Sequence, residues 1–167
     1  MDASELLTSP PHAFDGFEVA LDPPEKQDGL TWARYRFACR GCAGRSFTLE
    51  EMLSGQYGAA GVEATCCRCG RTECVFHASR DGYDGRLGHL PFLEETTGRQ
   101  RLRDHHGQPV EAGLVACEVS YSIDPDELAA LAAAKDVAPS DLFDGFAILT
   151  SPPGAVAWQY VWDYECA

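Results

Sequence analysis

Two pairs of cysteines constrain this chain more than any other feature of its sequence. Each is a Cys-x2-Cys pair, one in residues 39–42 and the other in residues 66–69. Two thiolates three positions apart on a tight turn can face one ion, and two such turns complete a tetrahedral site with no open coordination position. A closed site of this kind is structural and not catalytic. The spacing therefore predicts a metal centre made by Cys39, Cys42, Cys66 and Cys69.

Other residues near the second pair are alternative ligands. Cys74 and His77 form a Cys-x2-His pair, and Cys67 lies within the second Cys-x2-Cys pair, so each can replace one of the four. Zinc is the expected ion, one per chain, although four thiolates also hold iron. The remaining cysteines, Cys117 and Cys166, lie in alternating apolar stretches and are expected to be buried free thiols.

Residues 32–79 resemble the zinc-ribbon superfamily, in which each Cys-x2-Cys turn caps a β-hairpin and both turns bind one zinc ion. Strand-like segments precede both cysteine pairs and follow the second one, as that fold requires. Between the turns, Thr48 and Glu51 fit a capping box, and the apolar residues Leu49 and Met52 predict a short helix. This resemblance implies that zinc holds together a region too small to fold on its own core.

The cysteine turns carry two weaker resemblances. Gly70 follows the second pair directly, and Ala43 stands at the matching position after the first pair. The pairs are similar in this limited respect to small bacterial double-Cys-x-x-Cys-Gly proteins, some of which are immunity proteins. They are also similar to the turns of rubredoxins, which would imply iron and electron transfer, but the proline and second glycine usual in rubredoxins are missing.

The chain as a whole is predicted to be an α+β protein, an antiparallel β-sheet with one or two short helices and the zinc ribbon as an insert. Residues 114–123 alternate as a half-buried strand, and Asp124 with Pro125 begins a helix. The even-numbered residues from Val156 to Cys166 give the last strand an aromatic face that is expected in the core. Four regions are expected: an N-terminal strand region at 1–31 that packs with the C-terminal part, the ribbon at 32–79, a loop or linker at 80–110, and a C-terminal α+β part at 111–167.

The sequence Phe-Asp-Gly-Phe occurs twice, at 14–17 and at 143–146. Each copy begins a turn and a short strand, meets a Pro-Pro break and precedes an aromatic strand that ends in cysteine. An internal duplication, in which only the first copy keeps its cysteine turn, is one explanation. Chance recurrence of an Asp-Gly turn between aromatic residues is the other.

Charge is distributed unevenly along the chain. Thirteen basic and 26 acidic residues give a net charge of −13, which disfavours binding of the whole molecule to nucleic acid or to an anionic membrane. All of the arginines nevertheless lie between Arg34 and Arg103. The candidate partner-binding residues are the arginines of the ribbon: Arg34, Arg36, Arg40, Arg45, Arg68 and Arg71. Ordinary surface charge in a lysine-poor bacterial protein is the alternative explanation.

No complete catalytic constellation is present in the sequence. The common phosphate-loop, dinucleotide-binding, nucleophile-elbow and His-Glu-x-x-His motifs are missing, and Asp104-His105-His106 lacks the later residues of the HNH nucleases that it partly resembles.

We therefore expect a non-enzymatic zinc-binding adaptor or regulator that binds a protein, or else nucleic acid, through its arginines. No membrane or small-molecule partner is expected, and an N-terminus without export features indicates the cytoplasm. The alternative is an acidic inhibitor that neutralises a basic toxin or nuclease, as immunity proteins do.

Overall fold

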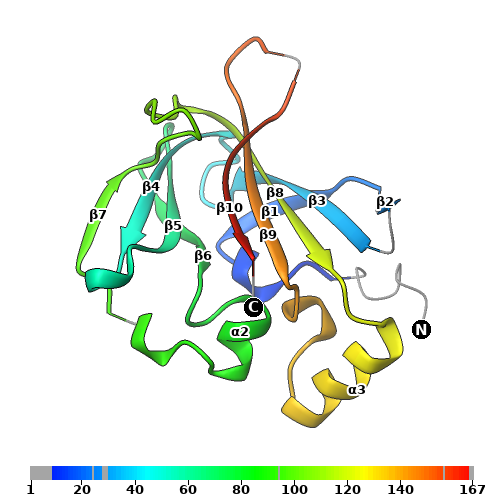
Figure 1. The fold of residues 1–167 in the computed structure, drawn as a ribbon. Coiled ribbons are helices and arrows are strands. Elements are labelled where there is room, and N and C mark those ends of the chain that lie inside the picture. Colours follow the sequence, from blue (N-terminus) through cyan, green and yellow to red (C-terminus); the bar gives the residue numbers. More distant parts are fainter. Residues whose placement is uncertain (1–8, 24, 28–29, 94, 156, 166–167) are drawn as a thin grey trace.

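Ten antiparallel strands and two short α-helices make up the part of the chain that the computed structural model describes, residues 9–23, 25–27, 30–93, 95–155 and 157–165. The strands are β1 (Phe17–Leu21), β2 (Glu25–Gln27), β3 (Leu30–Cys39), β4 (Ser46–Leu53), β5 (Ala59–Cys66), β6 (Thr72–His77), β7 (Gly98–Arg101), β8 (Gly113–Tyr121), β9 (Gly145–Ser151) and β10 (Gln159–Glu165). The helices are α2 (Gly82–Leu87) and α3 (Pro125–Lys135), and 3-10 turns lie at His12–Phe14, Gly55–Tyr57, Pro91–Leu93 and Pro139–Asp141. The sheet bends into a half-barrel with both helices at one end (Figure 1). The predicted class, an antiparallel sheet with short helices, is confirmed.

β8 pairs with other strands on both of its edges. One edge carries β9, and the opposite edge carries β3 as far as the pair of Arg36 with Ala116. β4 then returns to this same edge, where Ser46 pairs with Leu114. β3 and β4 therefore form one interrupted strand along β8, and residues 37–45 are an excursion opposite the single residue Val115. The strands of the expected ribbon insert thus belong to the same sheet as the rest of the chain.

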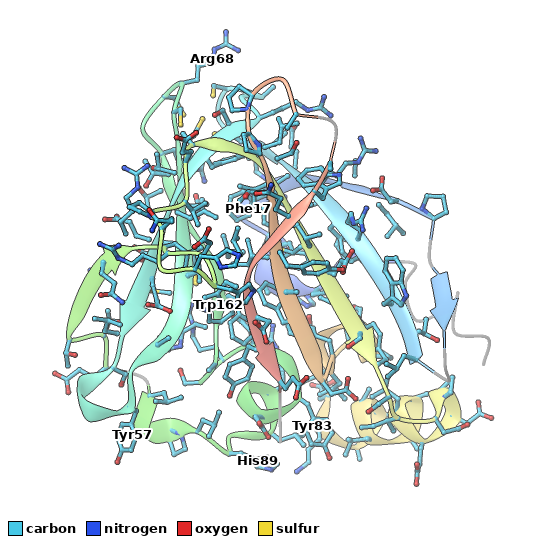
Figure 2. All side chains as sticks on the ribbon, turned by 45° about the horizontal axis from the view of Figure 1, so that its top comes forward. Phe17, Tyr57, Arg68, Tyr83, His89 and Trp162 are labelled. Atoms are coloured by element: carbon cyan, nitrogen blue, oxygen red, sulfur yellow. The ribbon has the colours of Figure 1, made fainter. Side chains whose placement is uncertain are left out.

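Aromatic side chains make up much of the core. The strand-like segment predicted before the first cysteine pair is confirmed as β3, in which every second residue from Thr31 to Cys39 is buried. Phe76 of β6 is fully buried, and its ring centroid lies 4.6 Å from that of Phe146 on β9 and 5.7 Å from that of Trp162 on β10. These contacts join β6 across the core to the β9–β10 pair, near the centre of the molecule where Figure 2 labels Trp162.

The C-terminal helix forms as predicted. The Asp124 side chain accepts hydrogen bonds from the backbone N–H groups of Asp126 and Glu127, and Pro125 occupies the first turn. Asp136 ends the helix in the left-handed conformation. The strand before it, β8, is also confirmed, and its cysteine at position 117 is buried as expected. Neither of the described helices is long and apolar enough to cross a membrane.

The short helix predicted after the first cysteine turn is wrong, because residues 46–53 form strand β4. Leu49 and Met52 lie three positions apart, which matches the spacing of a helix. In the regular pairing of β4 with β5, residues three positions apart point to opposite faces, and both of these side chains are buried. Burial on both faces therefore imitated a helical pattern, and pairing with β5 and β7 fixed the backbone as a strand.

β10 is less regular than the predicted aromatic strand. It begins at Gln159, and Val156 and Cys166 lie outside the described residues. Its pairing with β9 shifts between Tyr160 and Trp162. Because of this bulge Tyr160 is 53% exposed, whereas Trp162 is 8% exposed. The prediction of one buried aromatic face is therefore wrong at Tyr160 and confirmed at Trp162.

The segment 80–110, expected to be a loop or linker, contains both α2 and β7. β7 pairs with β4, and two apolar residues beyond it, Leu102 and Val110, are buried. The backbone N–H of Leu102 also donates to Leu49 O. The segment is therefore packed on the sheet, which its Gly-, Arg- and His-rich sequence did not indicate.

The two Phe-Asp-Gly-Phe segments have similar surroundings. Each begins at or just after a 3-10 turn and leads into the first strand of an antiparallel pair, β1 with β3 and β9 with β10. The segments also lie close together, because the ring centroids of Phe14 and Phe146 are 6.2 Å apart. Just before the two segments, the Asp141 carboxylate accepts a hydrogen bond from His12 N–H at 2.7 Å. This likeness agrees with an internal duplication, which stays a hypothesis.

We expect Phe76→Ala to lower the free energy of unfolding by about 3–5 kcal/mol, because it leaves a cavity between β6 and the β9–β10 pair. Leu114→Ala removes a side chain that is 41% exposed and should cost less than about 1 kcal/mol. Urea unfolding followed by tryptophan fluorescence measures both values. A loss at Phe76 no larger than the loss at Leu114 would contradict this description of the core.

Candidate metal centre

Four cysteine sulfurs converge where the two Cys-x2-Cys turns meet. The Sγ atoms of Cys39, Cys42, Cys66 and Cys69 all lie within 4.8 Å of one another. The Sγ atoms of Cys39 and Cys69 are 3.5 Å apart, and those of Cys42 and Cys66 are 3.6 Å apart. Disulfide sulfurs are about 2.05 Å apart, whereas sulfurs bound about 2.3 Å from one tetrahedral ion are about 3.8 Å apart. The predicted cluster is therefore present, and its spacing fits one metal ion.

The two turns have the same backbone structure. In each, the first cysteine exchanges hydrogen bonds with the residues four and five positions later. These bonds are Cys39 N–H to Gly44 O at 2.8 Å, Ala43 N–H to Cys39 O at 2.7 Å, Cys66 N–H to Arg71 O at 2.8 Å and Gly70 N–H to Cys66 O at 2.9 Å. The residue after the second cysteine is left-handed in both turns, with φ 56° at Ala43 and 74° at Gly70. Ala43 thus adopts the conformation that glycine takes in the second turn.

Direct contacts between the turns bring the sulfurs together. Cys67 N–H donates to Ser46 O at 2.9 Å, which ties the second turn to the start of β4. A Cβ atom at Gly44 would lie only 3.0 Å from Cys66 Sγ and 3.2 Å from Cys42 Sγ, so glycine allows this close approach. Sequence reasoning missed Gly44 and Ser46 because their roles depend on how one turn lies against the other.

One expectation of the zinc-ribbon resemblance is wrong for the first turn. β5 and β6 pair with each other around the second turn, as a ribbon requires. β3 and β4 do not pair with each other, because both lie end to end along β8. The first turn is therefore an excursion from an interrupted strand and not the cap of a hairpin.

The sulfurs differ in how readily they lose a proton. Burial acts to raise the pKa of Cys66, but hydrogen bonds from the backbone N–H groups of Cys69 and Arg68 and from neighbouring thiols lower it to about 7. The N–H of Gly44 acts to lower the pKa of Cys42, but burial and its hydrogen bonds to the other sulfurs raise it to about 12. A Cys66 thiolate that accepts a hydrogen bond from the Cys42 thiol accounts for both directions. An ion that binds here displaces the remaining protons, so its affinity falls as the pH decreases.

The alternative ligands lie away from the cluster. Cys74 Sγ accepts a hydrogen bond from Arg80 Nη2 at 3.0 Å, and burial raises the pKa of this thiol to about 11. His77 is the last residue of β6, at the end opposite the cysteine turn, and its Nδ1 atom lies 2.9 Å from Oγ of Ser79 just after the strand. Cys67 is exposed and stands outside the sulfur cluster. Within the described part of the chain, the four predicted cysteines make the one cluster of three or more metal-ligating groups.

The structure divides the six candidate arginines into two groups. Three form ion pairs at N–O distances of 2.5–2.8 Å: Arg34 with Glu118, Arg36 with Asp22, and Arg71 with Glu73. The other three, Arg40, Arg45 and Arg68, are exposed on or beside the cysteine turns and have no acidic partner among the described residues. Arg68 donates to Cys42 O at 3.0 Å, and Figure 2 shows its side chain projecting from this end of the molecule. The basic surface is therefore smaller than predicted and lies at the cysteine turns.

The Asp104-His105-His106 segment forms a turn. Asp104 Oδ1 accepts hydrogen bonds from the backbone N–H groups of Gln108 at 2.8 Å and His106 at 2.9 Å, and these bonds hold the pKa of Asp104 below its usual value. Both histidines are exposed. The Asp104 carboxylate thus stabilises its own turn by hydrogen bonds to the backbone. Among the described residues, Asp104, His105 and His106 belong to no cluster of three metal-ligating groups.

Comparison with known proteins assigns the chain to no family. No protein-family model matches it. No curated protein and no solved structure matches it either. The four-sulfur cluster and the charges around it therefore carry the functional interpretation.

We expect Ala43→Gly to raise the free energy of unfolding of the metal-loaded protein by up to about 1 kcal/mol. The left-handed conformation costs alanine about 1–2 kcal/mol in the folded state. The greater conformational freedom of glycine in the unfolded chain offsets about 0.5–1 kcal/mol of the stability gained by the substitution. Gly70→Ala is the matched reverse change and should lower stability by a similar amount. Urea unfolding at saturating zinc measures both variants. Shifts of the same sign in the two variants would contradict the equivalence of the turns.

Proposed function

We propose that this protein is a non-enzymatic adaptor or regulator in which one zinc ion holds two cysteine turns that present arginines to a macromolecular partner. The spacing of the four sulfurs, which suits a closed tetrahedral site, is the observation that carries the proposal. A four-thiolate site leaves no coordination position for a substrate, so the ion stabilises structure. The cytoplasm is the proposed compartment because its reducing conditions keep such thiols available for metal.

The arginines of the cysteine turns are the proposed contact surface. Arg40, Arg45 and Arg68 have guanidinium groups without acidic partners among the described residues, and such groups bind carboxylates and phosphates. Zinc with four thiolates carries a charge of about −2, which the same arginines offset. An acidic protein surface is the preferred partner, because the net charge of −13 disfavours nucleic acid.

A second candidate function is inhibition of a basic protein. The net charge of −13 favours rapid association with a basic partner. Asp126 and Asp163 are exposed acidic side chains on different parts of the fold, and the Asp124 carboxylate is engaged as the cap of α3. The two candidate functions use surfaces of opposite charge, so charge-reversal variants separate them.

Protein produced without a histidine tag should contain one zinc ion per chain and show no visible absorbance. Cys42→Ser and Cys69→Ser should each lose most of the metal, because a serine hydroxyl cannot replace a thiolate ligand. Cys67→Ser is the matched control and should keep its zinc, since this exposed cysteine stands outside the cluster. Plasma mass spectrometry and absorbance on the same samples measure metal content. Iron with thiolate absorption bands would instead support electron transfer, and full zinc content in Cys42→Ser would refute the site.

Arg40→Glu combined with Arg68→Glu should reduce capture of the partner by about tenfold or more, because the contact surface reverses its charge. Arg103→Glu combined with Lys135→Glu is the control, since it changes the net charge equally at exposed positions elsewhere. Quantitative cross-linking in the producing cells, with and without nuclease treatment, measures capture and separates protein from nucleic acid. For an acidic inhibitor the result is opposite: Asp126→Lys with Asp163→Lys abolishes capture, and the arginine variant retains it.

A further inference from the structure

A groove of about 340 Å³ lies on the outward side of the sheet. Its lining residues come from four neighbouring strands, β3, β8, β9 and β10. Trp32, at one side of the groove, precedes Cys39 on β3 by seven positions, which corresponds to roughly 23 Å along a strand. The groove is therefore a different surface from the arginines of the cysteine turns.

The register of the four strands explains the shape of the groove. One row of paired positions is Arg34, Glu118, Ala147 and Asp163, and the next row is Trp32, Ser120, Gly145 and Glu165. Ala147, Ser120 and Gly145 are small, so they form a floor between the outer strands. Trp32 stands on β3, and Asp163 with Glu165 stands on β10, three strand spacings or about 14 Å away at the backbone.

The negative charge of the groove is concentrated on β10. Glu118, on β8, accepts hydrogen bonds from Arg34 Nε at 2.8 Å and Arg34 Nη2 at 2.5 Å, and also from the Tyr160 hydroxyl. Asp163 and Glu165 are exposed and form no ion pair with any described residue. Because Arg34 neutralises Glu118, two uncompensated carboxylates remain along the β10 side.

Arg34 shows which kind of cation suits this surface. Its guanidinium carbon lies 5.8 Å from the centre of the Trp32 ring, while its nitrogens donate to Glu118. A planar guanidinium can stack on an aromatic ring and also donate paired hydrogen bonds to a carboxylate. A lysine ammonium is a compact point charge without this planar face. The groove offers the same two elements again, the exposed ring of Tyr160 and the carboxylates of Asp163 and Glu165.

We propose that this groove binds an arginine side chain of a partner protein, which lies over the small residues of the floor, beside Trp32, and pairs with Asp163 and Glu165. The net charge of −13 attracts a basic partner over a longer range and speeds its approach. The inference does not depend on the metal or on the turn arginines. It goes beyond the proposed role of the turn arginines and deepens the second candidate function, because it assigns a ligand, an arginine side chain, to the acidic surface that contains Asp163.

A fluorescently labelled hexa-arginine peptide tests the proposal by anisotropy with the purified, zinc-loaded full chain. Asp163→Asn with Glu165→Gln should weaken binding at least about fivefold through loss of the two carboxylates. Glu127→Gln with Asp136→Asn removes the same charge from exposed positions at the two ends of α3 and should change affinity less than about twofold, because solvent and salt screen distant charges.

Three further variants test the shape of the groove without changing its charge. Ala147→Leu fills the floor and should weaken peptide binding at least about fivefold. Ala130→Leu adds the same side chain to an exposed position on α3 and should leave affinity unchanged within about twofold. Tyr160→Ala removes an exposed aromatic ring at the groove, so it lowers affinity with little effect on the core. Thermal unfolding verifies that each variant is folded.

The outcomes that would overturn the proposal are specific. They are no binding of hexa-arginine by the wild type, equal affinity for a hexalysine peptide, equal losses in the two acidic double variants, or unchanged binding in Ala147→Leu. A preference for hexa-arginine with losses confined to the groove variants supports it. None of these results bears on the cysteine turns, so failure here leaves the zinc-dependent function standing.

Discussion

The pairing of β3 and β4 with one edge of β8 is the constraint on which the rest of the structure depends. Both strands must lie along that edge, although the chain leaves it after Arg36 and returns only at Ser46. An unsupported excursion inside a strand would carry conformational entropy that opposes folding. Here the bond from Cys67 N–H to Ser46 O holds the second cysteine turn against the end of the excursion, and the four sulfurs converge beside it. An ion bound by the four cysteines would fix the point at which two halves of the sheet are joined.

The sequence predicted those parts of the fold whose local pattern agrees with their tertiary surroundings. β3 and β8 alternate because one face is buried along their whole length, and α3 begins at Asp124 because the carboxylate caps it without help from other elements. The four cysteines could be grouped from spacing alone, since each turn is local. Their metal-ligating role remains a prediction from that spacing and from the distances between the sulfurs.

The parts that could not be predicted depend on contacts between distant segments. Leu49 and Met52 are buried on opposite faces of β4, a situation that leaves no period-two signal in the sequence. Tyr160 is exposed because of a bulge that only the pairing with β9 reveals. The outward groove combines residues of four strands, and its floor exists only once their register is known. The charged residues of the sequence therefore indicated an acidic protein, but not which of its acidic side chains form a surface that can bind a partner.

The charges of the folded molecule form two separate surfaces. Arginines without acidic partners in the described chain stand at the cysteine turns, and free carboxylates stand on β10. Such a separation orients the molecule in the field of a charged partner before contact is made. It also means that a protein with a net charge of −13 can present a basic face to an acidic surface. The average charge alone is thus a poor guide to what this protein contacts.

The place of the excursion in the chain has a consequence for biosynthesis. Both cysteine turns and the β5–β6 pair are complete by His77, whereas β8 begins only at Gly113. Contacts between the turns close short loops, while the pairing of β3 with β8 must close a much longer one. With the proposed zinc site, a nascent chain leaving the ribosome could bind its ion before the strand that unites β3 and β4 has been translated. Metal supply during translation would then determine whether β8, when it emerges, meets an edge that is already assembled.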